Sequence, residues 1–396
     1  MLGADPGFGR EVTGLEPERV RALMQRMGVT RLADVTGLDR LGIPVFVAVR
    51  PNSRSVATSQ GKGLSTAAAR LGALMEAAET WHAERVAAPL RLAAANELDG
   101  PVIEVDLLPR GRDAPLDRDR PILWLAGRRL RTGAPAWVPF ELVHTDYRLP
   151  APPAADCFQL TSSGLAAAPS RDVAVRHAVC ELIERDALTL WSQRAPRERL
   201  GHLVHPEALG SAELVALRHA LTAAGFSIGL ADITSDLGLP CALAVLADRC
   251  EPDGHPGLGT ACDPDPARAA LRALLEAAQV RTSYIAGSRD DLAPDEYGIA
   301  GLRAKRDFVA PLLTKATPSR AWPSGTPELG AEPGEQIAAV GERLARAGLA
   351  EPVLVDLGRP ETGLAVVRVL APGLEGNSDD PAYRPGARAL AVRGQG

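Results

Sequence analysis

The sequence has few aromatic residues, few lysines and no excess of positive charge. Phe, Trp and Tyr make up 4% of its 396 residues, and Asp plus Glu outnumber Lys plus Arg by 49 to 44. Proteins that bind nucleic acids need a basic surface and, for single strands, aromatic platforms on which the bases stack. We therefore expect no nucleic-acid partner.

Long apolar runs and paired cysteines are also missing. No uncharged apolar stretch approaches the roughly 18 residues of a membrane-spanning helix. Residues 1–6 have neither the basic start nor the apolar centre of a secretion signal. We expect a cytoplasmic protein without a membrane partner. The five cysteines, at positions 157, 180, 241, 250 and 262, include no Cys-x-x-Cys pair, so we expect reduced, mostly structural thiols.

The apolar spacing predicts a mixed chain of helices and strands. Helices are expected over 16–28, 65–86, 172–193, 212–224, 264–287 and 333–348. Strands are expected over 43–49, 102–106, 122–126, 136–143, 226–231, 240–247, 353–357 and 364–369. Because no change of composition marks a linker, we expect a single α+β domain, with a short helical segment at 1–40 and an irregular tail at 376–396.

Three of the expected helices repeat one polar pattern inside apolar sequence. Each carries a Glu that is followed three residues later by Glu or Gln, and the three pairs lie roughly 100 residues apart. The pairs are Glu76/Glu79, Glu181/Glu184 and Glu276/Gln279, and the residues four positions before them are Gly72, His177 and Arg272. At ~100° per residue these offsets share a helix face about 60° wide, so each helix carries a narrow polar stripe.

The stripes have two interpretations. They could face solvent, as most helical carboxylates do, but the flanking positions are too apolar to leave much outer surface, and Leu188 on the second stripe is expected to be buried. Five glutamates gathered in one cavity would repel each other unless cations neutralised them. Mg²⁺ is commonly bound by few carboxylates together with phosphate oxygens, and Arg185 and Arg272 could hold phosphate. The stripes favour a magnesium–nucleotide site.

The stretch Ser59–Gly63, with Lys62, precedes the first of these helices. It is not a Walker A loop, because a glycine follows the lysine. We expect a turn, which either cradles an anion before the helix or is an ordinary connection. A metal-dependent hydrolase is less favoured, because His177 is the only one of the seven histidines that stands on a stripe, and zinc sites usually use several.

Together these segments resemble the YcaO family. The first match is Ser59–Gly63 with Glu76 and Glu79, and the second is Ser163–Ala167 with Glu181, Glu184 and Arg185. The third match is Arg272-Ala273 with Glu276, Gln279 and Arg281. The resemblance covers about residues 41–375, which we take as a YcaO-like domain with helix–strand pseudo-repeats and an ATP site without a Walker motif.

The resemblance implies an enzyme that uses ATP and Mg²⁺ to phosphorylate the oxygen of a peptide backbone amide. By this comparison Glu76, Glu79, Glu181, Glu184 and Glu276 are metal ligands. Lys62, Glu76, Glu79, Glu184, Arg185, Arg272 and Gln279 bind ATP. Glu181, Arg185, Arg272 and Glu276 are catalytic. The sequence departs from the family pattern at Gly72, Pro169, Val173 and Cys262, which leaves an altered site open.

The reaction subclass follows from the C-terminal third. The sequence lacks the alternating prolines of many azoline-forming members, and Arg281–Asp291 with Pro372–Gly376 resembles members that act beside a TfuA protein in thioamide formation. We expect thioamidation of a ribosomally made precursor peptide, with azoline or amidine formation as alternatives. A non-catalytic scaffold is the alternative from another class. The family also implies a homodimer and a TfuA-like or leader-binding partner.

Overall fold

A computed structural model describes residues 16–110, 117–151, 157–290, 292, 294–314, 322, 329–376, 378, 380 and 383–394. Contacts divide the chain into two compact units. Unit 1 comprises Met1–Ala77, Ala195–Thr234 and Leu239–Pro327, and unit 2 comprises Ala78–Arg194, Ser235–Gly238 and Glu328–Gly396. Each unit gathers separate stretches of chain, so no contiguous linker exists that composition could mark.

The first sheet of unit 1 is antiparallel, in the order β1 (Arg31–Asp34), β2 (Val45–Val49) and β3 (Thr58–Lys62). Helix α2 (Pro17–Met27) precedes it, and helix α3 (Thr66–Ala83) follows β3. Strand β3 and the start of α3 touch at Gly61, where an added Cβ would lie 2.0 Å from the Ala69 carbonyl oxygen. A glycine is needed here because the two backbones meet directly.

The second sheet of unit 1 is sandwiched between helices. It has the order β10 (Gly257–Cys262), β9 (Cys241–Asp248) and β8 (Phe226–Asp232). Helices α6 (Ala212–Ala223) and α7 (Pro266–Ala286) pack on it around a core that includes Leu221, Phe226 and Leu246. The backbone of α8 (Ile299–Thr314) reaches the sheet at Gly229. Helix α5 spans Pro196–Leu200.

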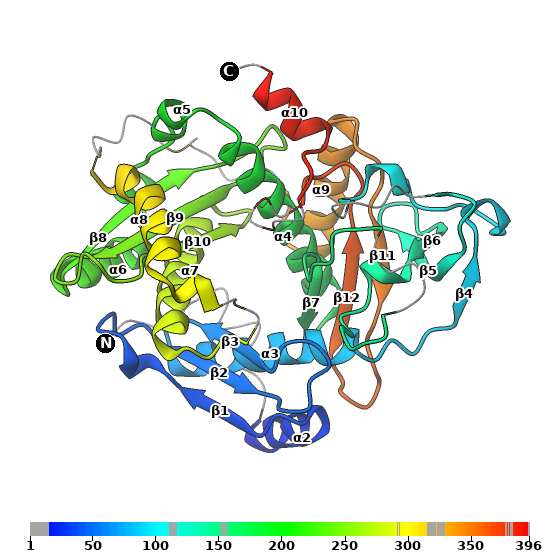
Figure 1. Ribbon diagram of the computed structural model, residues 1–396, viewed down its shortest axis with the longest axis horizontal. Helices are drawn as coiled ribbons and strands as arrows, with labels where there is room; N and C mark the ends of the chain where they lie inside the picture. Colours follow the sequence, from blue (N-terminus) through cyan, green and yellow to red (C-terminus); the bar gives the residue numbers. More distant parts are fainter. Residues whose placement is uncertain are drawn as a thin grey trace. The chain divides into compact units, whose positions relative to one another are not determined.

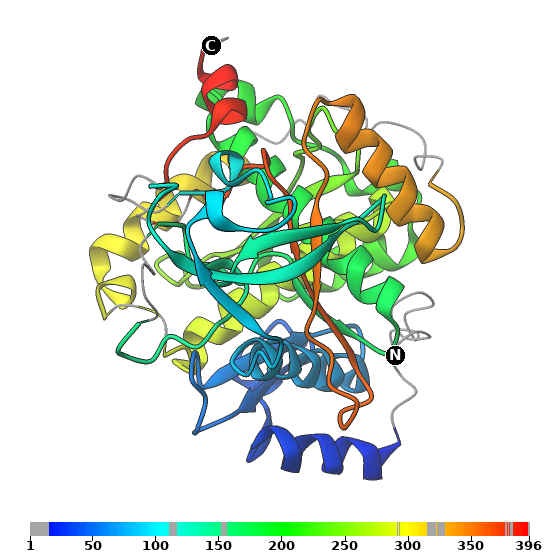
Figure 2. The same ribbon diagram turned by 90° about the vertical axis from the view of Figure 1, so that its right-hand side faces the viewer.

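Unit 2 is built on a six-stranded sheet. The order is β4 (Leu90–Ala93), β5 (Ile122–Arg129), β11 (Val353–Asp356), β12 (Ala365–Leu370) and β7 (Leu165–Ala168), and β6 (Pro135–Pro139) pairs with β5. Helix α4 (Arg171–Ser192) packs on β12 and β7, and α9 (Pro333–Arg346) and α10 (Ala387–Arg393) pack on α4 (Figure 1, Figure 2). Because α4 is covered by the sheet and by these helices, 14 of its 22 residues are buried.

The short 3-10 helices are η1 (Thr36–Leu38), η2 (Ala95–Glu97), η3 (Val105–Leu107), η4 (Phe140–Leu142), η5 (Pro206–Leu209) and η6 (Pro294–Tyr297). The mixed helix and sheet content confirms the predicted fold class. All six helices expected from the sequence form within a few residues of their predicted bounds. The pseudo-repeat is also present, because each of the long helices α3, α4 and α7 directly follows a strand, β3, β7 and β10 respectively.

Four local predictions are wrong. The strand predicted over 136–143 ends early, because β6 stops at Pro139 and the chain then forms η4. Residues 102–106 form no strand, because Val102 makes a single bridge to Trp137 and the chain then enters η3. The stretch Ser59–Gly63 is largely strand β3 rather than a turn, since β2 supplies its backbone partners. The tail 376–396 is not irregular throughout, because it contains α10.

Helix α10 forms because unit 2 provides its contacts. Ala389 is fully buried, and the carboxylate of Glu375 accepts the backbone N–H groups of Gly386 and Ala389, each at 2.9 Å. Arg388 donates to both oxygens of the buried Asp186, at 2.9 Å each. A carboxylate at a helix start satisfies N–H groups that have no partner within the helix.

The sequence predicts neither a membrane-spanning helix nor paired cysteines. None of the described helices is long and apolar enough to cross a membrane. The five cysteines are thiols, four of them buried, and Cys250 is exposed. The expectation of structural thiols is confirmed for the buried four.

Candidate functional site

Unit 1 brings Lys62 to the third polar stripe. The Nζ of Lys62, the last residue of β3, lies 2.8 Å from Oε2 of Glu276 on α7. The neighbouring Gln60 accepts from Gln279 Nε2 at 3.4 Å and donates its backbone N–H to Oε2 of Glu76 on α3 at 3.0 Å. Residues of two stripes and of the lysine segment therefore meet around one strand end.

A bound cation would stabilise the carboxylates of this group. Burial raises the pKa of Glu76 to about 7, and Glu276 adds to the rise, while the Gln60 N–H, Lys62 and Arg289 oppose it. A carboxyl with this pKa carries only part of its charge at neutral pH. A bound cation would favour its charged form.

Arg272 is held by an acid that the sequence analysis missed. Its Nη1 lies 3.3 Å from Oδ2 of Asp263, and Nε of Arg268 lies 3.8 Å from the same oxygen. Asp263 directly follows β10 and is itself buried. The signal in the sequence was an acid just before a helix start, with arginines one and two turns into that helix.

Unit 2 carries the remaining predicted residues. Oε2 of Glu181 on α4 accepts the backbone N–H of Gly164 at 3.0 Å, and Oε1 of Glu79 accepts that of Ala167 at 2.9 Å. Arg185 lies 3.7 Å from Glu181 and 3.6 Å from Glu184. Burial raises the pKa of Glu181, and the charge of Arg185 opposes the rise. This group too is a set of carboxylates with little positive charge.

The polar stripes do not face open solvent. Glu184 is buried, and the other eight stripe positions are half-buried between buried neighbours. Leu188 is 8% exposed, as predicted. A protein tolerates half-buried carboxylates when they are hydrogen-bonded or bind cations, and here backbone N–H groups, Lys62 and Arg185 supply part of that compensation.

The donor set fits Mg²⁺ only together with another ligand. Among the described residues, no three His, Cys, Asp or Glu side chains form a group that could hold a metal ion. Mg²⁺ takes oxygen ligands and is usually bound by one or two carboxylates, with waters and substrate phosphates completing its shell. The glutamates are suited to that mode. Their assignment to Mg²⁺ and ATP stays a prediction.

The four residues that depart from the family pattern all fit their surroundings in the structure. An added Cβ at Gly72 would lie 3.3 Å from the Cα of Gly61, so α3 has little room for a larger residue here. Val173 and Cys262 are buried, and Pro169 is exposed between β7 and α4. None of the four disrupts the strand–helix unit that carries it.

Comparison with known proteins decides the family. Residues 60–375 match the sequence model of the YcaO cyclodehydratases, which are described as ATP- and Mg²⁺-binding. The chain belongs to the YcaO family. An uncharacterised protein of Rhizobium leguminosarum bv. trifolii, encoded in the tfuA 3′ region, is 36% identical over 384 residues, covering 95% of this chain and 90% of its own.

Solved YcaO structures share the fold. YcaO from Methanopyrus kandleri, determined with AMPPCP and Mg²⁺, has a TM-score of 0.70 and 24% identity and covers 95% of this chain and 97% of its own. A heterocyclase in complex with substrate and cofactor has a TM-score of 0.73 and 22% identity over 93% of this chain. The chain spans 54% of the length of that heterocyclase. At these identities the likeness shows the fold.

Proposed function

We propose that this YcaO protein uses Mg²⁺ and ATP to activate a peptide backbone amide and that the product is a thioamide. The observation that carries the proposal is the retention of all five stripe glutamates, half-buried or buried, with Lys62 placed 2.8 Å from Glu276. Two similar structures, one determined with AMPPCP and Mg²⁺ and one of a heterocyclase with substrate and cofactor, support the same chemistry.

The residues take the following roles in this proposal. Glu76, Glu79, Glu181, Glu184 and Glu276 are the oxygen ligands for Mg²⁺. Lys62, Arg185, Arg272 and Gln279 contact the nucleotide. Bound Mg²⁺ would neutralise phosphate charge in the phosphoryl transfer. Asp263 positions the Arg272 guanidinium, and the backbone N–H groups of Gln60 and Gly164 orient two of the carboxylates.

The proposed reaction consumes ATP as a co-substrate. The amide oxygen attacks the terminal phosphorus of ATP, and ADP leaves. A sulfur nucleophile then forms a bond to the amide carbon, the carbon–oxygen bond breaks, and phosphate departs with that oxygen. Phosphorylation matters because an amide oxygen is otherwise a very poor leaving group. Positioning and charge neutralisation provide most of the catalysis in such transfers.

The partner and subclass assignments rest on the relatives. The similar Rhizobium protein, encoded in the tfuA 3′ region, favours a TfuA-like partner and thioamide formation. Azoline or amidine formation on the same activated amide is the alternative, because only the nucleophile differs. A homodimer also stays a prediction, which sedimentation of the purified protein would test.

Calorimetric titration of Mg–ATP tests the site. We expect binding by the wild type and at least tenfold weaker binding by Glu181→Gln and Glu276→Gln. Glu342→Gln is the matched control, because Glu342 pairs with Arg346 on the exposed side of α9. Equal affinity in all four proteins would contradict the assigned ligands.

The reaction itself needs a second experiment. The protein, Mg–ATP, hydrosulfide and a candidate precursor peptide are incubated with and without a TfuA-like protein. Replacement of oxygen by sulfur in the peptide, seen by mass spectrometry, supports thioamidation, whereas loss of one water indicates azoline formation. Mg–ATP binding without peptide-dependent phosphate release under any condition would favour the scaffold.

A further inference from the structure

Arg368 is a buried cation. It lies in β12 of unit 2 and is 1% exposed. Its Nη2 donates to the carbonyl oxygen of Thr161, while Nε and Nη1 have no hydrogen-bond partner among the described residues. Among the residues that the structure describes, no carboxylate forms a salt bridge with it. Two donors of a fully buried guanidinium are therefore unsatisfied.

Such an arrangement is energetically unfavourable. A buried charge without an ion pair loses its hydration and gains no comparable interaction in exchange. Burial lowers the pKa of Arg368 to about 10, and the ionisable groups that oppose this are Tyr147 and Glu181. Glu181 is engaged by the N–H of Gly164 and by Arg185. The guanidinium remains charged at neutral pH, and its Nε and Nη1 atoms can donate hydrogen bonds to a bound ligand.

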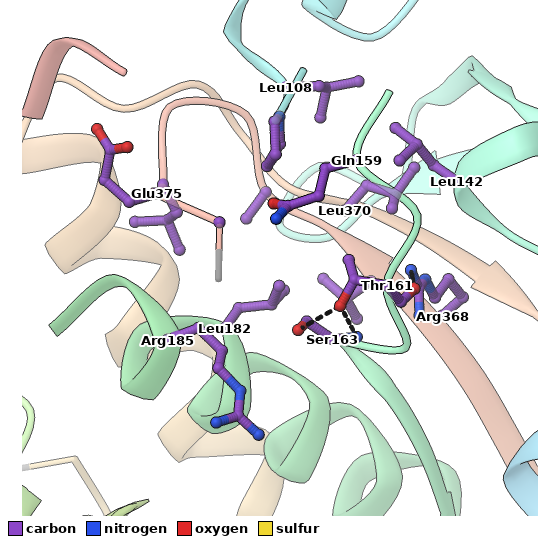
Figure 3. Close-up of a pocket in the computed structure, with 15 residues that line it drawn as sticks. Leu108, Leu142, Gln159, Thr161, Ser163, Leu182, Arg185, Arg368, Leu370 and Glu375 are labelled. Carbon is purple, nitrogen blue, oxygen red and sulfur yellow. Dashed lines mark hydrogen bonds between the residues drawn. The ribbon is translucent and has the colours of Figure 1, made fainter. Parts of the chain in front are cut away.

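The side chain lines a small cavity inside unit 2. The cavity has a volume of about 40 Å³, which is enough for about three water molecules at ~10–15 Å³ each. Figure 3 shows Arg368 and Thr161 on one side of it, with Leu108, Leu142 and Leu370 among the surrounding side chains. The hydroxyls of Thr161 and Ser163, 2.9 Å apart, are hydrogen-bonded to each other. The lining also contains Arg185, which is paired with Glu181 and Glu184, and Glu375, whose carboxylate accepts backbone N–H groups. Of the described cations that line the cavity, Arg368 is the one without a salt bridge, and the walls are mostly apolar.

We propose that the Arg368 cavity binds a small monoanion and that in the reaction above this anion is hydrosulfide. The single unpaired charge calls for one negative charge, the volume excludes a nucleotide or a peptide, and apolar walls favour a weakly hydrated anion. Ser163 directly precedes Gly164, whose N–H donates to Glu181, and Thr161 lies two residues before Ser163. The cavity therefore adjoins a predicted catalytic residue. The identity of the anion rests on the proposed function, whereas the anion site itself does not.

The proposed chemistry balances without a further reactant. The sulfur electron pair of hydrosulfide forms the new bond to the phosphorylated amide carbon. The carbon–oxygen bond breaks, phosphate leaves with the former amide oxygen, and the proton of hydrosulfide ends on that phosphate. No oxidant or reductant is needed. In this scheme Arg368 holds the nucleophile and gives it up as the carbon–sulfur bond forms.

Bromide is a suitable probe, because its NMR line broadens when it binds to a protein. We expect the wild type to broaden the bromide line, hydrosulfide to reverse the broadening at constant ionic strength, and Arg368→Met to reduce it at least tenfold. Arg368→Lys keeps the charge and should retain weaker binding. Arg129→Met is the matched control, because Arg129 lies in the same sheet but is paired with Glu104 at 2.9 Å. Thermal melting of each variant checks that it is folded.

The outcomes separate this inference from the proposed function. Equal broadening by wild type and Arg368→Met, or none by either, overturns the anion site even if the wild type binds Mg–ATP. Broadening that depends on Arg368 but is not reversed by hydrosulfide overturns the identity of the anion. Reversal by hydrosulfide in a protein that binds no Mg–ATP upholds the anion site and contradicts the proposed function.

Discussion

The ammonium group of Lys62 lies 2.8 Å from the carboxylate of Glu276, although 214 residues separate them in the chain. Lys62 is one of three lysines among 44 basic residues. A compact, mobile ammonium can exchange a carboxylate for a phosphate more readily than a forked guanidinium can. The pair therefore links the family's lysine segment to the third polar stripe at the place where the nucleotide is proposed to bind.

Replacing Lys62 is expected to weaken nucleotide binding. Lys62→Met removes a charge-assisted hydrogen bond worth about 1.5–3 kcal/mol, so the Kd for Mg–ATP should rise at least tenfold in calorimetry. Lys305→Met is the control, because Lys305 pairs with Glu296 elsewhere in unit 1. Equal affinities of the two variants for Mg–ATP would contradict a role of Lys62 in nucleotide binding.

The raised pKa of Glu76 predicts a pH dependence of stability. Its pKa is about 7 in the folded protein, whereas an ordinary glutamate has a pKa of 4.5, so the folded state binds the additional proton between these values. Stability without Mg²⁺ should therefore fall as pH rises from 4.5 through about 7. Urea unfolding of the wild type and of Glu76→Gln should show this slope in the wild type and a smaller one in the variant.

Mg–ATP binding should have the opposite pH dependence to the stability of the ligand-free protein. A bound cation favours the ionised carboxylate, so Mg–ATP binding should release protons and tighten as pH rises toward and above 7. Titrations in buffers of different ionisation enthalpy measure that release. Proton release that is the same in Glu76→Gln as in the wild type would contradict a role for this carboxyl.

Arg388 is expected to hold α10 on unit 2. Arg388→Met would leave Asp186 buried with its charge unpaired, and breaking such a pair costs about 3–5 kcal/mol. Urea unfolding should show the loss, and amide exchange should speed up in residues 387–393. Arg393→Met is the control, because Arg393 donates to Gln193 at an exposed position and should change stability by less than about 0.5 kcal/mol.

Two glycine substitutions should act in opposite directions. Gly61→Ala places a Cβ within 2.0 Å of the Ala69 oxygen in α3 and should destabilise the protein strongly. Gly341→Ala, inside α9, meets nothing within 4 Å and should stabilise the protein by about 0.5–1 kcal/mol because alanine favours the helix. Thermal melting of both variants provides the comparison. Similar shifts would contradict the contact of β3 with α3.

The helices were the most predictable part of the fold. Their apolar period is local, so α3, α4 and α7 and the polar stripes on them follow from residue order alone. The glycines of Ser59–Gly63 predict a turn where the structure has strand β3. The partner strand β2 and the contact of Gly61 with α3 favour extended backbone instead. Helix α10 was missed because its N-terminal partner, Glu375, and its ion-pair partner, Asp186, lie outside it in sequence.

The sequence by itself determined the family and the mixed fold and indicated the side chains that are proposed to carry the chemistry, because motif spacing and helical period are properties of neighbouring residues. The tertiary structure decided the partners of those side chains. Lys62 contacts Glu276, Asp263 holds Arg272, and Arg368 is buried with no salt bridge to any carboxylate in the described part of the chain. Such pairings, and the pKa shifts that burial causes, depend on which distant segments pack together, and no local pattern in the chain specifies that.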